Sequence, residues 1–157
     1  MVKKIKYKRP SWDEYFMNMA KVAKDRSNCL RQTVGAVLVK DQRIIATGYN
    51  GAPMGVKNCI DGGCERCLQR ERGELEENVE YELCLCLHAE QNSVLQSAYH
   101  GMSTKGATLY STIAPCLQCA KALINAGVAE IVYDEDHSDK LGLKLLKAAG
   151  VKIRKYK

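Results

Sequence analysis

The stretch Ala107-Thr108-Leu109-Tyr110-Ser111-Thr112 is rich in strand-forming residues, and the segments that follow it decide the class of the fold. A helical pattern covers 116–126, and the short run Ile131-Val132-Tyr133 after it is a second strand. A further helix over 139–149 leads to a final strand at 151–153. Strands that alternate with helices in this way predict a layered α/β domain.

Toward the N-terminus the pattern changes from alternation to a helix followed by a hairpin. Ser11-Trp12-Asp13-Glu14 has the form of a capping box, and the apolar residues after it predict a helix to about Lys24. Two β-rich runs, 34–39 and 43–49, are joined by a polar turn at 40–42 and predict an antiparallel hairpin. The whole chain therefore predicts one α/β domain over 1–157, with a mixed sheet of about five strands.

After His88, Val94, Leu95 and Ala98 predict a helix. Between the hairpin and this helix, the segment 51–87 has no clear periodicity. It far exceeds the roughly 12–15 residues at which a loop in a compact domain calls for a special reason. Five of its residues are cysteines, which offer that reason as a metal-binding insertion. The six glutamates between 71 and 82 predict an exposed acidic flap.

Composition restricts the compartment and the partners of the protein. No apolar run is long enough to span a membrane, and the basic start lacks the apolar segment of a signal peptide, so we expect a cytoplasmic protein. In that reducing setting the eight cysteines favour metal binding over disulfides. Much of the net charge of +6 lies at the two ends of the chain. We interpret these ends as solvated termini in preference to a nucleic-acid interface, since aromatic residues do not interleave with the C-terminal charges.

Two motifs carry the chemistry: His88-Ala89-Glu90 and Pro115-Cys116-Leu117-Gln118-Cys119. One imidazole and two thiolates, from His88, Cys116 and Cys119, give three ligands for a tetrahedral zinc and leave the fourth position for water, as in catalytic zinc sites. Glu90 is then the group that moves protons to and from this water. Because His88 and Glu90 are two residues apart, both reach one site only if the tripeptide lies at a loop-to-helix junction. A His-x-Glu followed by Pro-Cys-x-x-Cys is the recorded signature of zinc deaminases that act on cytosine or adenine.

Further segments narrow this match, and together they resemble the deoxycytidylate (dCMP) deaminase family from Ser11 to Tyr133. They include Ser27-Asn28-Cys29-Leu30-Arg31, Val34-Gly35-Ala36-Val37, Gly48-Tyr49-Asn50-Gly51-Ala52-Pro53, His88-Ala89-Glu90-Gln91-Asn92 and Gly106-Ala107-Thr108-Leu109-Tyr110. The resemblance implies a three-layer α/β/α cytidine-deaminase-like fold and zinc-dependent hydrolysis of dCMP to dUMP and ammonia, which supplies thymidylate synthesis. It also implies a homo-oligomer, often a hexamer, with dCTP and dTTP as effectors.

The same resemblance suggests how a nucleotide is held. The Ala89 backbone N–H would help hold the pyrimidine, and Asn50 would contact the sugar, although Asn before Gly is also a common turn residue. Arg26 is a candidate for the phosphate, with a bystander on the surface as the alternative. Tyr133 either flanks the base or belongs to the core. His100 and His137 lack ligand spacing, and we expect both at the surface.

The remaining six cysteines indicate a second, structural zinc: Cys29, Cys59, Cys64, Cys67, Cys84 and Cys86. We favour Cys59, Cys64 and Cys67 with either Cys84 or Cys86. Related deaminases use a cysteine matching Cys29, whereas its place near the end of the first helix fits an ordinary buried thiol.

Three alternatives to dCMP deamination stay open. The first is a deaminase of free CMP or cytidine, and the second is a deaminase of tRNA or single-stranded DNA. The third is a zinc-stabilised nucleic-acid-binding module with a vestigial site. Glu90 argues against the last, because a purely structural zinc has no use for an acid–base group.

Overall fold

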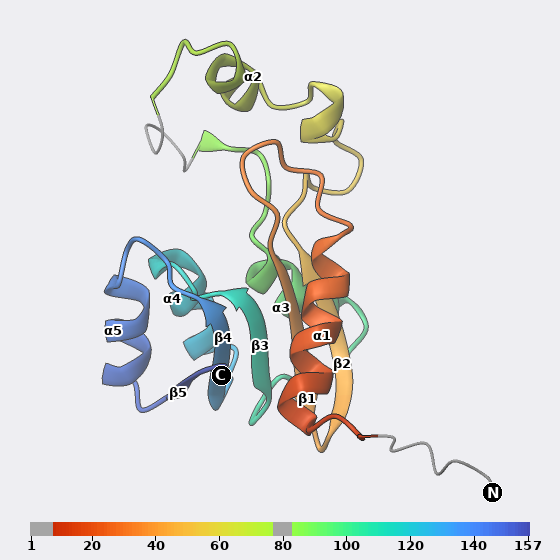
Figure 1. Cartoon of the computed structure of the whole chain (residues 1–157), viewed down its shortest axis with the longest axis vertical. Coiled ribbons are helices and arrows are strands. Elements are labelled where there is room, and N and C mark those ends of the chain that lie inside the picture. Colours follow the sequence, from red (N-terminus) through yellow and green to blue (C-terminus); the bar gives the residue numbers. More distant parts are fainter. Residues whose placement is uncertain (1–7, 77–82) are drawn as a thin grey trace, which may run out of the picture.

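The structure is a computed structural model that describes residues 8–76 and 83–157 (Figure 1). The basic residues Lys3, Lys4 and Lys6 lie outside the described residues, as do three glutamates of the acidic flap, at 77, 80 and 82. Among the helices of the described part, none is long and apolar enough to cross a membrane.

Five strands form one mixed sheet in the order β2-β1-β3-β4-β5. The hairpin strands pair antiparallel, and β1 also pairs antiparallel with β3, whereas β3, β4 and β5 run parallel. The strands are β1 (Gly35–Lys40), β2 (Arg43–Tyr49), β3 (Thr108–Ile113), β4 (Glu130–Glu135) and β5 (Lys152–Lys155). The predicted class and strand number are therefore confirmed, although β4 and β5 extend further than their short apolar cores indicated.

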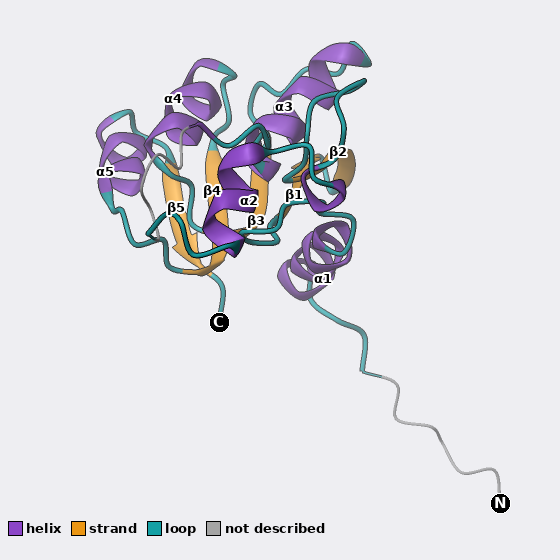
Figure 2. Cartoon of the chain, turned by 90° about the horizontal axis from the view of Figure 1, so that it is seen from above, coloured by secondary structure: helices purple, strands orange, loops and turns teal. Residues whose placement is uncertain are grey.

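Helices cover both faces of this sheet and make the three layers that the family resemblance implies (Figure 2). On one face lies α1 (Trp12–Lys24), which begins with the expected capping box at Ser11. On the other face lie α3 (Ala89–Tyr99), α4 (Leu117–Asn125) and α5 (Leu141–Ala148).

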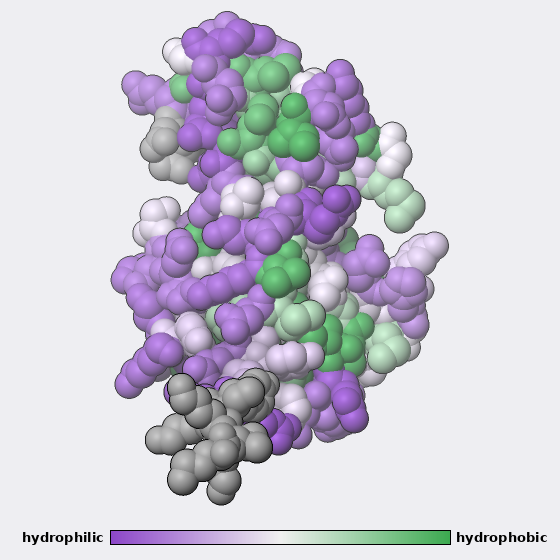
Figure 3. Space-filling view, turned by 45° about the vertical axis from the view of Figure 1, so that its right-hand side comes forward, coloured by the Kyte–Doolittle hydropathy of each residue, from purple (hydrophilic) through white to green (hydrophobic). Residues whose placement is uncertain are grey.

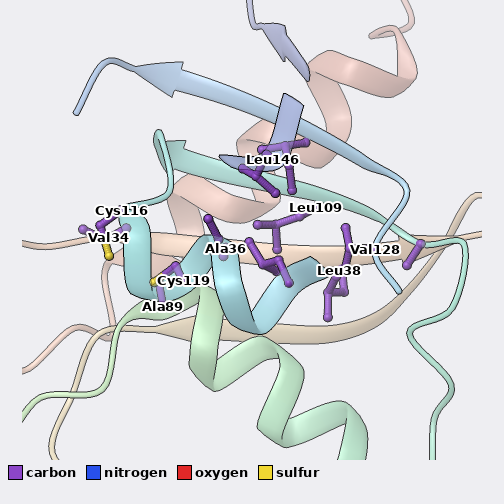
Figure 4. Close-up of a cluster of buried hydrophobic side chains, with 13 residues drawn as sticks. Val34, Ala36, Leu38, Ala89, Leu109, Cys116, Cys119, Val128 and Leu146 are labelled. Carbon is purple, nitrogen blue, oxygen red and sulfur yellow. The ribbon is translucent and has the colours of Figure 1, made fainter. Parts of the chain in front are cut away.

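Alternation along the central strands builds a core on each face. Val37 and Tyr110 pack with Phe16 of α1, whereas Leu38 and Leu109, their neighbours in the chain, point to the opposite core. This is the period of two that a strand imposes on its side chains. The second core continues to the paired cysteines of α4, so the functional motifs rest on it (Figure 4).

The segment 51–87 contains local structure that the sequence did not predict. A 3-10 helix, η1 (Cys59–Asp61), is followed by the seven-residue helix α2 (Glu65–Glu71) at one end of the molecule (Figure 1). Neither is long enough to show a clear apolar periodicity, because the residues buried within them are mostly cysteines. The acidic start of the predicted flap is exposed, as expected, and Arg72 pairs there with Glu65 and Glu74.

Candidate catalytic zinc centre and nucleotide pocket

Both motifs lie at the N-terminal ends of helices. His88 is the N-cap of α3 and Cys116 is the N-cap of α4. The His88 backbone N–H donates to Gln91 Oε1 at 3.1 Å, which closes the first turn of α3. The loop-to-helix junction required for His88 and Glu90 is therefore present. Pro115 directly precedes the N-cap of α4 and so lies just outside the helix.

The three predicted ligands converge at these helix ends. His88 Nδ1 lies 3.4 Å from Cys116 Sγ and 3.3 Å from Cys119 Sγ, and all three ligand atoms lie within 4.8 Å of one another. A tetrahedral zinc with ordinary Zn–N and Zn–S bonds separates its nitrogen and sulfur ligands by about 3.5 Å. The arrangement therefore fits a zinc ion bound through His88 Nδ1 and both thiolates.

The two thiols of this centre differ in acidity. Hydrogen bonds from Cys119 and then from His88 lower the pKa of Cys116 to about 3. Its hydrogen bond to Cys116, together with burial, raises the pKa of Cys119 well above its usual value. The Cys116 thiolate in turn raises the pKa of His88. Both shifts favour a Cys116 thiolate paired with a protonated His88, so metal binding through His88 Nδ1 would release a proton.

Glu90 is buried beside this centre with 3% of its surface exposed. Burial raises the pKa of Glu90 to about 7, and its side chain interacts with that of Cys119. A carboxyl group with a pKa near the working pH can both accept and return a proton, which is the property a general acid–base group needs. The position and acidity of Glu90 therefore suit proton transfer at a fourth zinc position.

Close backbone packing fixes the two helix ends. A Cβ at Gly48 of β2 would lie 2.1 Å from the Ala89 carbonyl oxygen, so the first turn of α3 rests directly on the strand. Asn92 of α3 also donates to the Tyr49 carbonyl at 2.7 Å. Behind α4, a Cβ at Gly142 of α5 would lie 2.2 Å from the Pro115 carbonyl oxygen. In this way β2 and α5 support the two halves of the site.

A pocket beside the centre is lined by two of its three ligands, His88 and Cys116, and by Glu90. Asn50 and Ala89, which the resemblance places at the nucleotide, also line it, whereas Arg26 is exposed outside it and the buried Tyr133 is not among its lining residues.

Three polar residues of the pocket received no site role from the sequence: Arg31, Gln32 and His137. His137 was expected at the surface; it is partly exposed and accepts the Asp139 N–H through Nδ1 at 3.0 Å. Arg31 stands in one of the matched segments, which was the only signal for it. His137 gave none, because the turn after β4 brings it to the pocket from far along the chain.

Asn50 has a structural role whatever its contact with a ligand. Its Oδ1 accepts from Ser27 Oγ at 2.6 Å and from the Val34 N–H at 2.7 Å. Its Nδ2 donates to the Gln32 carbonyl, which leaves one amide N–H for another partner. The turn interpretation and the ligand interpretation of Asn50 are therefore compatible.

A layered α/β fold with a His–Cys–Cys centre at two helix N-termini is the arrangement of a zinc-binding domain. Residues 10–135 match the family model described as the cytidine and deoxycytidylate deaminase zinc-binding region. The chain belongs to this family.

Several relatives of the chain are named deoxycytidylate deaminase. The chain is 42% identical over 149 residues to the deoxycytidylate deaminase of Saccharomyces cerevisiae and 45% identical over 149 residues to that of Schizosaccharomyces pombe. These alignments cover 94% of the chain but only 46% and 45% of the two relatives, so the chain spans about half their length. The deoxycytidylate deaminase of Mycobacterium phage D29 is 40% identical over 132 residues. This alignment covers 82% of the chain and 98% of the phage protein.

Among solved structures, the dCMP deaminase of cyanophage S-TIM5 in complex with dCMP and dUMP superposes with a TM-score of 0.77. It is 33% identical, and the match covers 96% of this chain and 100% of that one.

Proposed function

We propose that this protein deaminates dCMP hydrolytically to dUMP and ammonia. The observation that carries the proposal is a buried carboxyl group, Glu90, beside a His–Cys–Cys zinc centre at two helix N-termini. Support for the substrate comes from the relatives named deoxycytidylate deaminase, among them the phage protein of similar length. The cyanophage relative solved with dCMP and dUMP supports the same nucleotide.

Each residue of the site has a part in this reaction. Zinc, when bound by His88, Cys116 and Cys119, supplies the Lewis acid that brings the pKa of a water near neutrality. Glu90 would accept one proton of the attacking water and transfer it to N3 of the cytosine, and it would then take the second proton from the same oxygen, now bonded to C4, and deliver it to the amino group, which leaves as ammonia. Its pKa of about 7 allows these transfers in both directions near neutral pH. The Ala89 N–H, at the start of α3 where backbone donors lack helical partners, holds the pyrimidine carbonyl.

For the phosphate we propose Arg31 and His137, which line the pocket that Arg26 does not line. A guanidinium suits phosphate oxygens because it presents several fixed donors. The hydrogen bond from Asp139 to Nδ1 of His137 leaves its Nε2 as the protonated nitrogen, which makes Nε2 a donor. Asn50, with its remaining amide N–H, is proposed to contact the sugar.

Deamination of another cytosine or adenine substrate is the second candidate. A tRNA:A34 deaminase shares the fold at 21% identity and a TM-score of 0.53, which is a likeness of architecture alone. The small pocket and the dCMP relatives favour the mononucleotide. The buried Glu90 favours an enzyme over a zinc-stabilised binding module.

The proposal includes a structural zinc in the cysteine-rich insertion, one ion by the sequence argument. Assembly as a homo-oligomer, control by dCTP and dTTP, and a cytoplasmic location stay predictions of the family resemblance and of composition.

An ammonia-release assay tests the activity, with dCMP, CMP, deoxycytidine, cytidine and dCTP as substrates. We expect turnover of dCMP above the others. The Glu90→Gln variant should lose about 10²–10⁴-fold in rate, the usual contribution of a positioned acid–base group, while its zinc content stays unchanged. Normal turnover by Glu90→Gln, or no activity of the wild type on any of these substrates, would contradict the proposal.

A further inference from the structure

Six thiols that the catalytic centre does not use meet at one place near the pocket. Cys29 follows α1, Cys59 begins η1, Cys64 is the N-cap of α2, and Cys67 lies within that helix. Two more, Cys84 and Cys86, come from the loop that leads to α3. All six are free thiols, and all except the partly exposed Cys84 are buried. Together they form one apolar cluster, which we call the thiol cluster.

Within the thiol cluster the sulfurs form three overlapping groups in place of one group of four. In each group the three sulfurs lie within 4.8 Å of one another. The groups are Cys29–Cys67–Cys84, Cys29–Cys59–Cys86 and Cys59–Cys64–Cys67. Cys29, Cys59 and Cys67 therefore each belong to two groups, and they also lie within this distance of one another.

We infer that the thiol cluster binds two zinc ions, with six thiolates arranged as two tetrahedra that share an edge. A tetrahedral zinc–thiolate site places its sulfurs about 3.8 Å apart, given Zn–S bonds of about 2.3 Å. Two ions in contact need eight ligand positions, and six thiolates fill them when two thiolates bridge. Cys29, Cys59 and Cys67 are the candidates for the two bridges, because each is grouped with four of the other five sulfurs. A bridging sulfur neighbours all five, so the fifth sulfur moves within reach when the ions bind. This inference extends the structural-zinc part of the proposed function and does not depend on the substrate.

A single zinc with four thiolates accounts less well for these positions. The quartet favoured by the sequence omits Cys29, yet the Cys29 sulfur lies within 4.8 Å of the sulfurs of both Cys84 and Cys86. One zinc bound by four cysteines leaves two of the six sulfurs of the thiol cluster without a metal. Disulfides do not describe the contacts, since Cys67 Sγ and Cys84 Sγ lie 3.5 Å apart and a disulfide bond is about 2.05 Å long.

The surroundings suit a cluster with excess negative charge. Two zinc ions with six thiolates carry a net charge of −2. Arg66, between Cys64 and Cys67 on α2, is a buried cation with only 6% of its surface exposed, and Arg31 follows Cys29 by two residues. A buried cation is retained where anionic partners compensate it.

A two-ion cluster also explains how the described part of the insertion is held together. The end of the molecule that carries η1 and α2 exposes apolar residues among polar ones (Figure 3), and Ile60 of η1 is one of the exposed apolar residues. The buried core of this segment consists almost entirely of cysteines, which metal–thiolate bonds would join. They also anchor the chain before His88, because Cys86 stands two residues ahead of it and Leu87 pairs with Gly51 in a β-bridge.

The test is a metal count on the whole chain, prepared with zinc and measured by native mass spectrometry and elemental analysis. We expect three zinc ions per chain, and two in a Cys116→Ser/Cys119→Ser variant that lacks the catalytic ion. Stepwise loading of this variant with Co²⁺ should give a paramagnetic signal that grows with the first ion and falls with the second. The fall arises because ions that share thiolates couple magnetically.

One ion per chain in the double variant would overturn the inference, as would two Co²⁺ ions without coupling. Rapid alkylation of two thiols in the zinc-loaded double variant, or disulfides in its mass, would also overturn it. Because these measurements use a chain with an intact thiol cluster, they need no cluster variant that folds. Failure of the deaminase proposal is seen separately, as absent ammonia release from a wild type that still carries the two cluster ions.

Discussion

The contact between Gly48 and the first turn of α3 offers a direct test of how the fold sets the catalytic geometry. Replacing Gly48 with Ala places a Cβ 2.1 Å from the Ala89 carbonyl oxygen and 2.6 Å from the Ser93 nitrogen. Ordinary contact begins at 3.4 Å, so β2 and α3 must separate by more than about 1 Å. His88 and Glu90 stand within two residues of this contact, and the displacement therefore reaches the zinc centre.

The expected losses follow from this displacement. Overpacking of this kind costs about 1–3 kcal/mol, which lowers the melting temperature by about 2–12 °C for a chain of this length. A misplacement near 1 Å in an active site costs about 10²-fold in rate. We therefore expect Gly48→Ala to lose about 10²-fold in kcat/KM for dCMP, measured by ammonia release, at a temperature where the variant remains folded.

A matched control separates geometry from general destabilisation. Gly35→Ala creates a contact of the same size, 2.0 Å from the Ala20 carbonyl oxygen, but on the opposite face of the sheet against α1. This variant should lose similar stability while it keeps most of its activity. Equal loss of activity in both variants, or an unchanged rate in Gly48→Ala, would refute the reasoning that α3 packing sets the site.

Three further predictions concern stability and metal dependence. Ser11→Ala removes the capping hydrogen bond to Glu14 and should lower the free energy of unfolding by about 1 kcal/mol in urea titrations, whereas Ser11→Asn should keep most of it. The hydrogen bond from Arg154 lowers the pKa of Asp13 in the folded protein. The Asp13 carboxylate therefore stabilises the fold at any pH above the pKa that Asp13 has in the unfolded chain. This contribution is lost as the pH falls through the lower pKa that Asp13 has in the folded protein. Because the Asp13–Arg154 pair is about one-third exposed, Asp13→Asn should lower the free energy of unfolding by only about 1 kcal/mol at pH 7. The free energies of unfolding of wild type and variant should become equal in acid, and a difference that persists there would contradict this explanation. Removal of zinc with a chelator should abolish deamination and lower the melting temperature, and added zinc should restore both; full activity of the metal-free protein would contradict the role of the centre.

Much of the fold could be predicted from the sequence because its signals are local. The capping box at Ser11 and the hairpin turn at 40–42 each depend on residues close together in the chain, and both are present. The alternation of strands and helices after Ala107 likewise predicts the layered fold. Helix α2 was missed because it has only seven residues, of which Cys67 and Leu68 are the apolar ones, and two adjacent residues form no helical stripe.

For the site, the sequence by itself determined the chemistry: a His-x-Glu and a Cys-x-x-Cys carry their ligand types and spacing within a few residues. Only the tertiary structure decided which distant residues share that site. The loop after α1 carries Arg31, and the turn after β4 carries His137, and both reach the pocket although only Arg31 stands in a matched segment and His137 shows no motif signal. The contact of Cys29 with Cys84 and Cys86 likewise depends on how whole helices and loops pack together. No local sequence pattern predicts such contacts, because they join residues that are far apart in the chain. These residues meet only when the sheet and its helices assemble.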